Sequence, residues 1–256
     1  KSYKLSYNER KILSKNKPWG LILFKRNIKS LKQIISLIKK VKKLTKNPKF
    51  PIMIDEEGGT VTRLNNIIKN QLSQKFFGEI YKIDKIFGKN LYKIYINKIS
   101  TILKKIGINI NTVPVLDVLR GSTHKIIGTR SYSDDPKTIQ KLGKICVKQF
   151  EKNKIATVIK HIPGHGCALL DSHLKTPKVN LNFSKLNKID FTPFKLNQSK
   201  FAMTAHIIYK KIDNLNVATF SQKVIKKIIR KKIGFKGILM SDDISMKALK
   251  FDLLTN

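Results

Sequence analysis

The segment Ile52-Met53-Ile54-Asp55-Glu56-Glu57-Gly58-Gly59 joins a short apolar run directly to three acidic residues and two glycines. Similar short apolar runs recur along the chain, at residues 20–24, 52–55, 108–113, 156–161, 201–204 and 238–241. Stretches with helical apolar periodicity lie between them, at residues 31–44, 91–106, 138–153 and 221–233. Short strands that alternate with helices are typical of βαβ units. The sequence therefore predicts an α/β fold with a parallel sheet.

Polar residues follow five of these six predicted strands. They are Asp55–Gly59, Asp117, Lys160-His161, Thr204-Ala205-His206 and Ser241-Asp242-Asp243. In parallel α/β proteins, ligands bind at the carboxyl ends of the strands. Solvated loops would explain any one of these strand ends, but they explain all five poorly. We therefore expect a barrel with one active-site face. No repeat or linker divides the sequence, so we expect a single catalytic domain over residues 1–256.

The composition excludes several classes of protein. Hydrophobic residues make up 41% of the 256 residues, which is enough to form a core and excludes global disorder. No run approaches about 18 apolar residues and no secretion signal opens the chain, so we expect a soluble, cytoplasmic protein with no membrane partner. The two cysteines, Cys146 and Cys167, show neither a disulfide framework nor zinc-ligand spacing. We expect no metal and no organic cofactor.

The charge is strongly basic, with 53 Lys and Arg against 16 Asp and Glu and a formal net charge of +37. Such a charge favours nucleic-acid binding, because basic side chains neutralise phosphates. However, the only Arg residues are at positions 10, 26, 63, 120, 130 and 230, and the Lys residues are spread along the whole chain. Protein surfaces that bind nucleic acids specifically cluster their positive charge and are rich in Arg. We therefore expect no specific nucleic-acid partner, only non-specific attraction to anions.

Six segments of the chain carry a family resemblance. They are residues 20–27 (GLILFKRN), 55–64 (DEEGGTVTRL), 114–118 (PVLDV), 127–133 (IGTRSYS), 160–166 (KHIPGHG) with 171–173 (DSH), and 234–243 (GFKGILMSDD). Together they are similar to glycoside hydrolase family 3, specifically to the bacterial β-N-acetylglucosaminidases (β-N-acetylhexosaminidases) of peptidoglycan recycling. The resemblance implies a (β/α)8 TIM barrel. It also implies release of terminal, non-reducing β-linked N-acetylglucosamine from small muropeptide fragments.

The resemblance also implies which residues are catalytic. A retaining glycosidase needs a carboxylate that forms a covalent glycosyl intermediate and a proton donor for the leaving oxygen. Asp242 matches the family nucleophile. From the residues alone, Asp243 is a rival, and helix capping is the structural alternative for Asp242. In the resembling enzymes a His preceded two residues earlier by an Asp is the acid/base, which implies that Asp171 and His173 form this pair.

Two other histidines lie near that pair in the sequence. His161 and His165 lack an Asp two residues before them, and we interpret His165 as organising its loop. Gly164 and Gly166 are expected to give this loop the freedom to carry the acid/base pair in and out of the site.

The resemblance implies a subsite for the non-reducing sugar lined by Asp55, Arg63, Arg130, Lys160 and His161. A carboxylate can accept hydrogen bonds from two hydroxyls, and a guanidinium can donate two in parallel. We interpret Asp117 as structural, orienting its neighbours behind the site. His206 could either contact the ligand or support the nucleophile strand.

The number of strands departs from the family. A closed barrel of this type has eight strands, whereas we can place only six, and the first and the last are missing. We therefore expect an incomplete barrel with a gap between the strands at 20–24 and 238–241, and our preferred explanation is that the chain is a fragment of a longer gene product. Two alternatives stay open: a non-catalytic module that binds amino sugars or anionic polymers, and a β-glucosidase of the same family.

Overall fold

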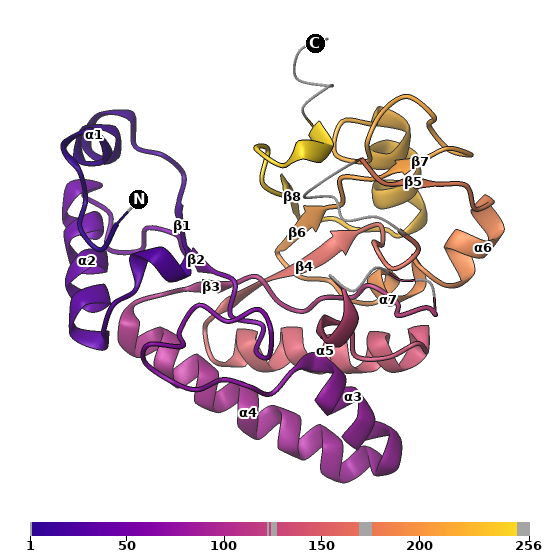
Figure 1. The fold of residues 1–256 in the computed structure, drawn as a ribbon, viewed down its shortest axis with the longest axis horizontal. Coiled ribbons are helices and arrows are strands. Elements are labelled where there is room, and N and C mark those ends of the chain that lie inside the picture. Colours follow the sequence, from indigo (N-terminus) through magenta and orange to yellow (C-terminus); the bar gives the residue numbers. More distant parts are fainter. Residues whose placement is uncertain (1, 122, 124–126, 169–175, 250–256) are drawn as a thin grey trace.

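The computed structural model describes residues 2–121, 123, 127–168 and 176–249. Its centre is a six-stranded parallel sheet in the order β1-β2-β3-β4-β6-β8 (Figure 1). These strands are β1 (Leu21–Leu23), β2 (Ile52–Ile54), β3 (Ile110–Asn111), β4 (Ala156–Ile162), β6 (Phe201–Thr204) and β8 (Ile238–Ser241). A separate parallel pair, β5 (Lys178–Val179) and β7 (Ile208–Tyr209), was not predicted. The six predicted strands are confirmed, and their sequential order is that of a (β/α) barrel.

Helices connect the strands. They are α1 (Tyr7–Lys11), α2 (Leu31–Leu44), α3 (Gln74–Ile83), α4 (Lys85–Ile106), α5 (Pro136–Lys152), α6 (Phe183–Lys188) and α7 (Thr192–Lys195), with π-helical segments at Ile12–Asn16 and Val224–Lys232 and 3-10 turns at Lys25–Asn27, Gly128–Arg130 and Lys247–Leu249. α2 has the predicted bounds. Ser30 caps it by accepting a hydrogen bond from the N–H of Gln33, and Ile34, Ile38 and Val41 bury its apolar face.

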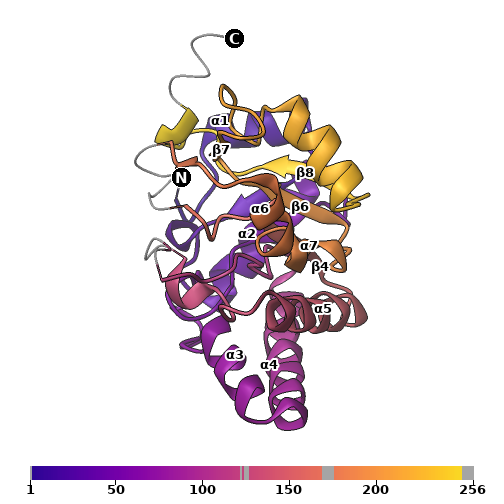
Figure 2. The same cartoon turned by 90° about the vertical axis from the view of Figure 1, so that its right-hand side faces the viewer.

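The α3–α4 hairpin is the largest helical feature that the sequence did not predict correctly. α4 begins six residues before the predicted start because Asp84 accepts hydrogen bonds from the backbone N–H groups of Ile86 and Phe87. α3 was missed altogether, since its stability comes from packing against α4, where the ring of Phe77 lies 4.6 Å from that of Tyr92. The hairpin projects from the rest of the molecule (Figures 1 and 2).

Apolar side chains cover both faces of the sheet. Ile52 and Ile54 of β2 point into the large core between the sheet and the helices. Met53 points to the other face, where it packs with Val158 and Phe201 in a smaller cluster. This alternation follows from the two-residue repeat of a strand. The smaller cluster occupies the position of a barrel interior.

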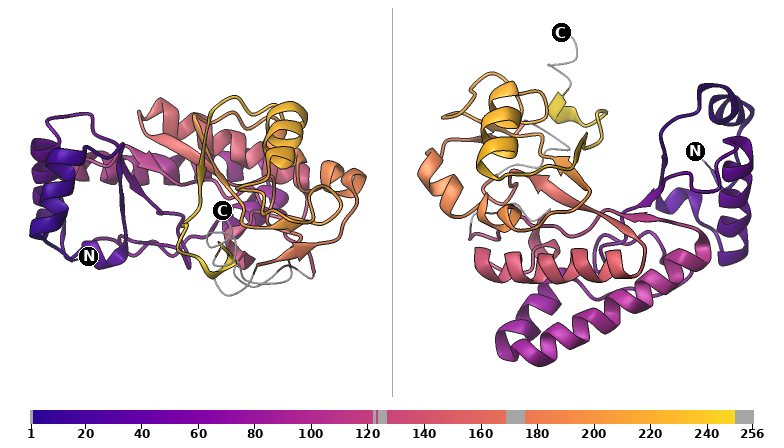
Figure 3. Two further views of the ribbon diagram at one scale, coloured as in Figure 1. Left: turned by 90° about the horizontal axis from the view of Figure 1, so that it is seen from above. Right: turned by 180° about the vertical axis from the view of Figure 1, so that it is seen from behind.

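The barrel is open between β1 and β8. In the described part of the chain, β1 pairs only with β2 and β8 pairs only with β6. A cavity of about 630 Å³ lies along the opening, lined by residues of both edges such as Ile22 and Met240. Ile238 on β8 is 57% exposed. The helices α1 and α2 lie on one side of the opening and the segment Val224–Lys232 on the other (Figure 3). The expected incomplete barrel, with its gap between these two strands, is confirmed.

Candidate active site

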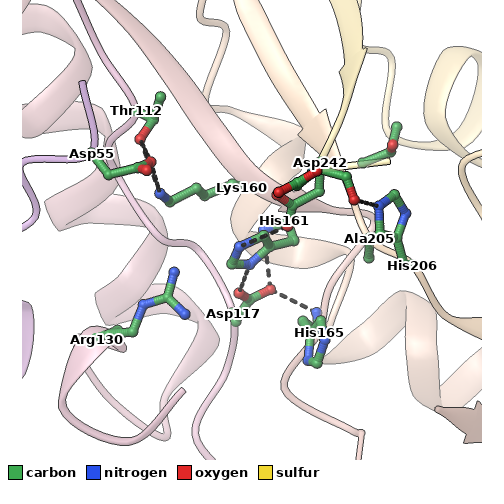
Figure 4. Close-up of polar contacts among 12 residues, drawn as sticks. Asp55, Thr112, Asp117, Arg130, Lys160, His161, His165, Ala205, His206 and Asp242 are labelled. Atoms are coloured by element: carbon green, nitrogen blue, oxygen red, sulfur yellow. Dashed lines mark hydrogen bonds and ion pairs between the residues drawn. The ribbon is translucent and has the colours of Figure 1, made fainter. Parts of the chain in front are cut away.

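Asp55 occupies the carboxyl end of β2 and is held by three neighbours, of which Figure 4 shows Thr112 and Lys160. Nζ of Lys160 lies 3.1 Å from Oδ1, Nη2 of Arg63 lies 3.2 Å from Oδ2, and the hydroxyl of Thr112 donates to Oδ1. Burial alone would raise the pKa of Asp55. The charge of Lys160 and the hydrogen bond from Thr112 outweigh this effect and hold the pKa well below its usual value. The side chain is therefore a carboxylate at neutral pH.

Glu57 forms a second ionic cluster in the same site, which the sequence analysis missed. Arg130 donates to both carboxylate oxygens, at 2.8 and 2.9 Å, and Nζ of Lys160 lies 2.6 Å from Oε1. Burial would raise the pKa of Glu57, but the charges of Arg130 and Lys160 lower it to about 2. Burial would likewise lower the pKa of Lys160, but the two carboxylates raise it. Lys160 is thus a fixed cation that joins Asp55 to Glu57.

Glu56 has a structural role on the other face of the same strand end. Its side chain accepts hydrogen bonds from the hydroxyl of Thr62, the backbone N–H groups of Arg63 and Leu64, and the amide of Asn70. These contacts fold the loop after β2 back over the sheet. The loop thereby carries the guanidinium of Arg63 to Asp55.

His161 is held by Asp117, as Figure 4 shows. Nδ1 of His161 lies 2.7 Å from Oδ2 of Asp117, while Oδ1 accepts the backbone N–H of His165 at 2.6 Å. Burial would raise the pKa of Asp117, but His161 outweighs it and the pKa is lowered. A carboxylate at Nδ1 leaves Nε2 of His161 facing the site. The orienting role expected of Asp117 matches these contacts.

Consecutive residues Lys160 and His161 both reach the pocket, although neighbours on a regular strand point to opposite faces. The ladder between β4 and β6 shifts register between Lys160 and Ile162. Such an irregularity re-aims side chains and is common beside active sites.

The loop after β4 is closely packed. A Cβ atom at Gly166 would lie 1.9 Å from the carbonyl oxygen of Val118, and one at Gly164 would lie 2.9 Å from Cβ of Asp190. These glycines therefore serve close packing, and the loop freedom expected from the sequence stays a prediction. Burial lowers the pKa of His165 to about 4, so this ring is neutral at pH 7. Its backbone contact with Asp117 agrees with the expected loop-organising role.

Asp242 lies at the end of β8, where its Oδ2 is 4.0 Å from Nε2 of His161. Its rival Asp243 is engaged elsewhere, because its carboxylate accepts the N–H and hydroxyl of Ser245 at 2.8 and 2.7 Å. Nε2 of His206 lies 3.3 Å from the carbonyl oxygen of Asp243 and thus contacts the backbone beside Asp242. This contact favours the supporting role for His206.

One pocket of about 390 Å³ unites most of the predicted site. Its lining comprises Asp55, Glu57, Thr60, Val61, Arg63, Arg130, Lys160, His161, Met203 and Asp242. The structure therefore brings together six predicted residues, namely Asp55, Arg63, Arg130, Lys160, His161 and Asp242. The volume falls within the range of small-molecule sites, roughly 300–1,000 Å³. The predicted acid/base pair, Asp171 and His173, lies outside the described residues.

The sequence of the chain matches a known family. Residues 2–253 match the family described as Glycosyl hydrolase family 3 N terminal domain. The chain belongs to this family. The family 3 domain is 32% identical over 250 residues to "Beta-hexosaminidase" of Neisseria meningitidis serogroup C, with 96% of this chain and 68% of the relative covered. It is also 32% identical over 253 residues to "Beta-hexosaminidase A" of Pseudoalteromonas piscicida, with 90% of this chain and 41% of the relative covered.

Solved structures agree with the family. The family 3 domain resembles a glycoside hydrolase family 3 β-N-acetylglucosaminidase from Paenibacillus sp. str. FPU-7 with a TM-score of 0.90 and 28% identity, over 98% of this chain and 48% of that protein. The chain thus spans from about two fifths to about two thirds of the length of these relatives.

Proposed function

We propose that this family 3 domain hydrolyses terminal, non-reducing β-linked N-acetylglucosamine from small peptidoglycan fragments in the cytoplasm. The observation that carries the proposal is the pocket of about 390 Å³ that Asp242 lines together with Asp55, Lys160 and His161 (Figure 4). The relatives named β-hexosaminidase and β-N-acetylglucosaminidase support an amino-sugar substrate. The cell-wall origin of that substrate rests on the motif resemblance.

The charges of the pocket suit a neutral sugar. Three of its lining residues are acidic and three are basic: Asp55, Glu57, Asp242, Arg63, Arg130 and Lys160. They cancel formally, so these residues offer directional hydrogen bonds without a net formal charge. Asp55 presents acceptors to adjacent hydroxyls and Arg63 presents donors, while Lys160 uses its own donors to hold Asp55, Thr112 and Glu57 in place. Because Glu57 pairs with Arg130, that guanidinium is held in one orientation toward the ligand.

In the proposed reaction, a carboxylate oxygen of Asp242 attacks the anomeric carbon. The bond to the leaving oxygen breaks as His173 donates a proton to it, and a covalent glycosyl–Asp242 ester forms. His173 then removes a proton from water, which attacks the same carbon and releases Asp242 with retention of configuration. Asp171 orients the imidazole of His173. The roles of Asp171 and His173 are carried over from the family motif.

Asp117 orients His161 in this scheme, because its carboxylate accepts the N–H of Nδ1. This contact leaves Nε2 of His161 facing the pocket, 4.0 Å from Oδ2 of Asp242. We assign His161 to substrate holding, in agreement with the motif. His206 supports the backbone that positions Asp242.

The decisive experiment traps the intermediate. A fluorinated N-acetylglucosaminyl donor that forms the ester quickly and hydrolyses slowly should add one sugar to the purified protein. Mass spectrometry of peptides should place that sugar on Asp242. Label on Asp243, or none on a protein that still turns over substrate, would reject the nucleophile.

A matched pair of chromogenic substrates tests the substrate class. The β-N-acetylglucosaminide should be hydrolysed and the β-glucoside should not. Faster release from the glucoside would favour a β-glucosidase. Binding of N-acetylglucosamine without hydrolysis of either substrate would favour a non-catalytic module.

A further inference from the structure

The tip of the α3–α4 hairpin, residues 82–90, exposes large apolar side chains to solvent. Ile83 is 83% exposed, Ile86 is 76% exposed and Phe87 is 56% exposed. They are adjacent in space, because Ile83 ends α3 and the other two lie in the first turn of α4. Single exposed apolar residues are common on protein surfaces, but contiguous groups mark interaction sites. The hairpin tip is therefore a candidate interaction surface.

The hairpin tip is a short, closely packed turn between two helices. It forms the projecting end of the hairpin in Figures 1 and 2. A Cβ atom at Gly88 would lie 2.6 Å from Cα of Tyr81, which shows how closely the two helices approach each other. Asp84 fixes the turn by accepting the N–H groups of Ile86 and Phe87 at 2.8 and 3.0 Å. The apolar side chains are thus held outward on a stable support.

The charges around the hairpin tip are mainly positive. Lys82, Lys85 and Lys89 are all exposed and flank the apolar group. Asp84 is the acidic residue within this segment, and its carboxylate faces the backbone of α4. The nearest acidic side chain along α3, Glu79, lies 3.6 Å from Lys75, which offsets its charge. Exposed apolar side chains flanked by lysines match the chemistry of an anionic bilayer surface. The apolar side chains suit the lipid tails, and the lysines suit the anionic headgroups.

We propose that the hairpin tip docks this protein peripherally on an anionic lipid surface, with Ile83, Ile86 and Phe87 entering the interface and the three lysines contacting lipid headgroups. In the described part of the chain, no helix combines the length and apolar character needed to cross a membrane. The proposal concerns surface contact and revises the expectation, drawn from the sequence, that no membrane is a partner. It does not depend on the proposed catalytic function.

The topology places the hairpin tip toward the same end of the sheet as the pocket. α4 returns the chain to the amino end of β3, so its own N-terminus lies toward the carboxyl ends of the strands. The same carboxyl ends carry Asp55 and Lys160. The hairpin tip and the pocket therefore lie toward the same end of the strands.

Vesicle co-sedimentation tests the proposal. The protein should partition onto vesicles of phosphatidylcholine with phosphatidylglycerol and much less onto phosphatidylcholine alone. A triple variant, Ile83→Ser with Ile86→Ser and Phe87→Ser, should lower the partition coefficient about tenfold or more. A second triple variant, Lys82→Gln with Lys85→Gln and Lys89→Gln, should lower it by about fivefold per lysine at low salt. Circular dichroism and melting temperature check that the variants fold.

Matched controls separate the hairpin tip from the overall charge and apolar content. The apolar control replaces Tyr7, Leu196 and Leu215, which are 73%, 61% and 74% exposed, with Ser. The lysine control replaces the exposed residues Lys39, Lys40 and Lys43 of α2 with Gln. Both controls should leave partitioning nearly unchanged.

Three results would overturn the proposal. The first is no partitioning by the unaltered protein, and the second is an equal loss of partitioning in the controls and in the tip variants. The third, from light scattering, is a dimer that the apolar tip variant converts to a monomer without any change in vesicle binding. That result would assign the hairpin tip to a second copy of the chain.

Discussion

Nδ1 of His161 lies 2.7 Å from Oδ2 of Asp117, although the two residues are 44 positions apart in the chain. Both are buried at neighbouring strand ends, and the other ring nitrogen of His161 faces Asp242 at 4.0 Å. A carboxylate in this position fixes the tautomer and the orientation of an imidazole. The imidazole ring of His161 therefore links the position of Asp117 to that of the proposed nucleophile, Asp242.

Asp117→Asn should lower kcat by about 10- to 100-fold. This is the usual loss in metal sites when a residue that orients a histidine ligand is replaced. The amide keeps an acceptor for the N–H of His165 but can present an N–H group to Nδ1, which favours the wrong tautomer of His161. Steady-state kinetics should show a smaller change in KM than in kcat. Asp134→Asn, at a surface position, is the control, and equal kinetics for the two variants would contradict the orienting role.

Asp242→Asn should remove about four to five orders of magnitude from turnover, which corresponds to about 6 kcal/mol of barrier. Its neighbour supplies the matched control. Asp243→Asn should cost far less, because its carboxylate caps a turn through Ser245, a contact worth about 1 kcal/mol of stability. Turnover of a chromogenic N-acetylglucosaminide measures both. The opposite ranking of the two variants would show that the nucleophile is assigned wrongly.

His173→Ala should slow both chemical steps, but substrates with a good leaving group should be partly spared in the first step because they need little protonation. Rates for a series of aryl N-acetylglucosaminides with leaving groups of different pKa measure this dependence. Asp171→Ala should weaken activity through misorientation of the imidazole. A loss in His173→Ala that is the same for good and poor leaving groups would point to a structural role.

Glu57 should make the stability of the fold depend on pH in the acidic range. Its pKa falls from 4.5 to about 2 in the folded state, so the unfolded chain binds the proton more readily in this window. The stabilisation is fully present above about pH 4.5 and is lost as the pH falls toward 2. Urea unfolding from pH 6 to pH 3 should show this loss.

Glu57→Gln should remove that part of the pH dependence and lower the free energy of unfolding by about 3–5 kcal/mol at pH 7, because Arg130 and Lys160 lose a buried partner. Glu79→Gln is the control, since Glu79 is exposed and lies 3.6 Å from Lys75 in a surface pair of little energetic weight. Equal stability of the two variants would contradict the buried ionic cluster.

The sequence by itself determined the positions of the six strands of the main sheet, their parallel arrangement and the place of the site. Short apolar runs and the helical stripe of residues 31–44 are local patterns, so they could be located without knowledge of the fold. The polar residues at strand ends are also a local pattern and could be located in the same way. Since parallel strands share one carboxyl edge, these residues were expected to lie together. This is why Asp55, Lys160 and Asp242 were expected to meet, and the structure places all three in one pocket.

Tertiary structure alone decided which charges are paired and which surfaces stay exposed. The partners of His161 and Glu57 come from distant segments, and the curvature of the sheet selects them from among many acidic and basic residues. The shifted register at Lys160 sends two consecutive side chains into the same pocket, against the simple alternation of a strand. Tertiary packing also decides that Ile83, Ile86 and Phe87 are exposed. An apolar residue is buried or exposed according to what packs against it, and at the hairpin tip α3 and α4 use their other faces to pack against each other.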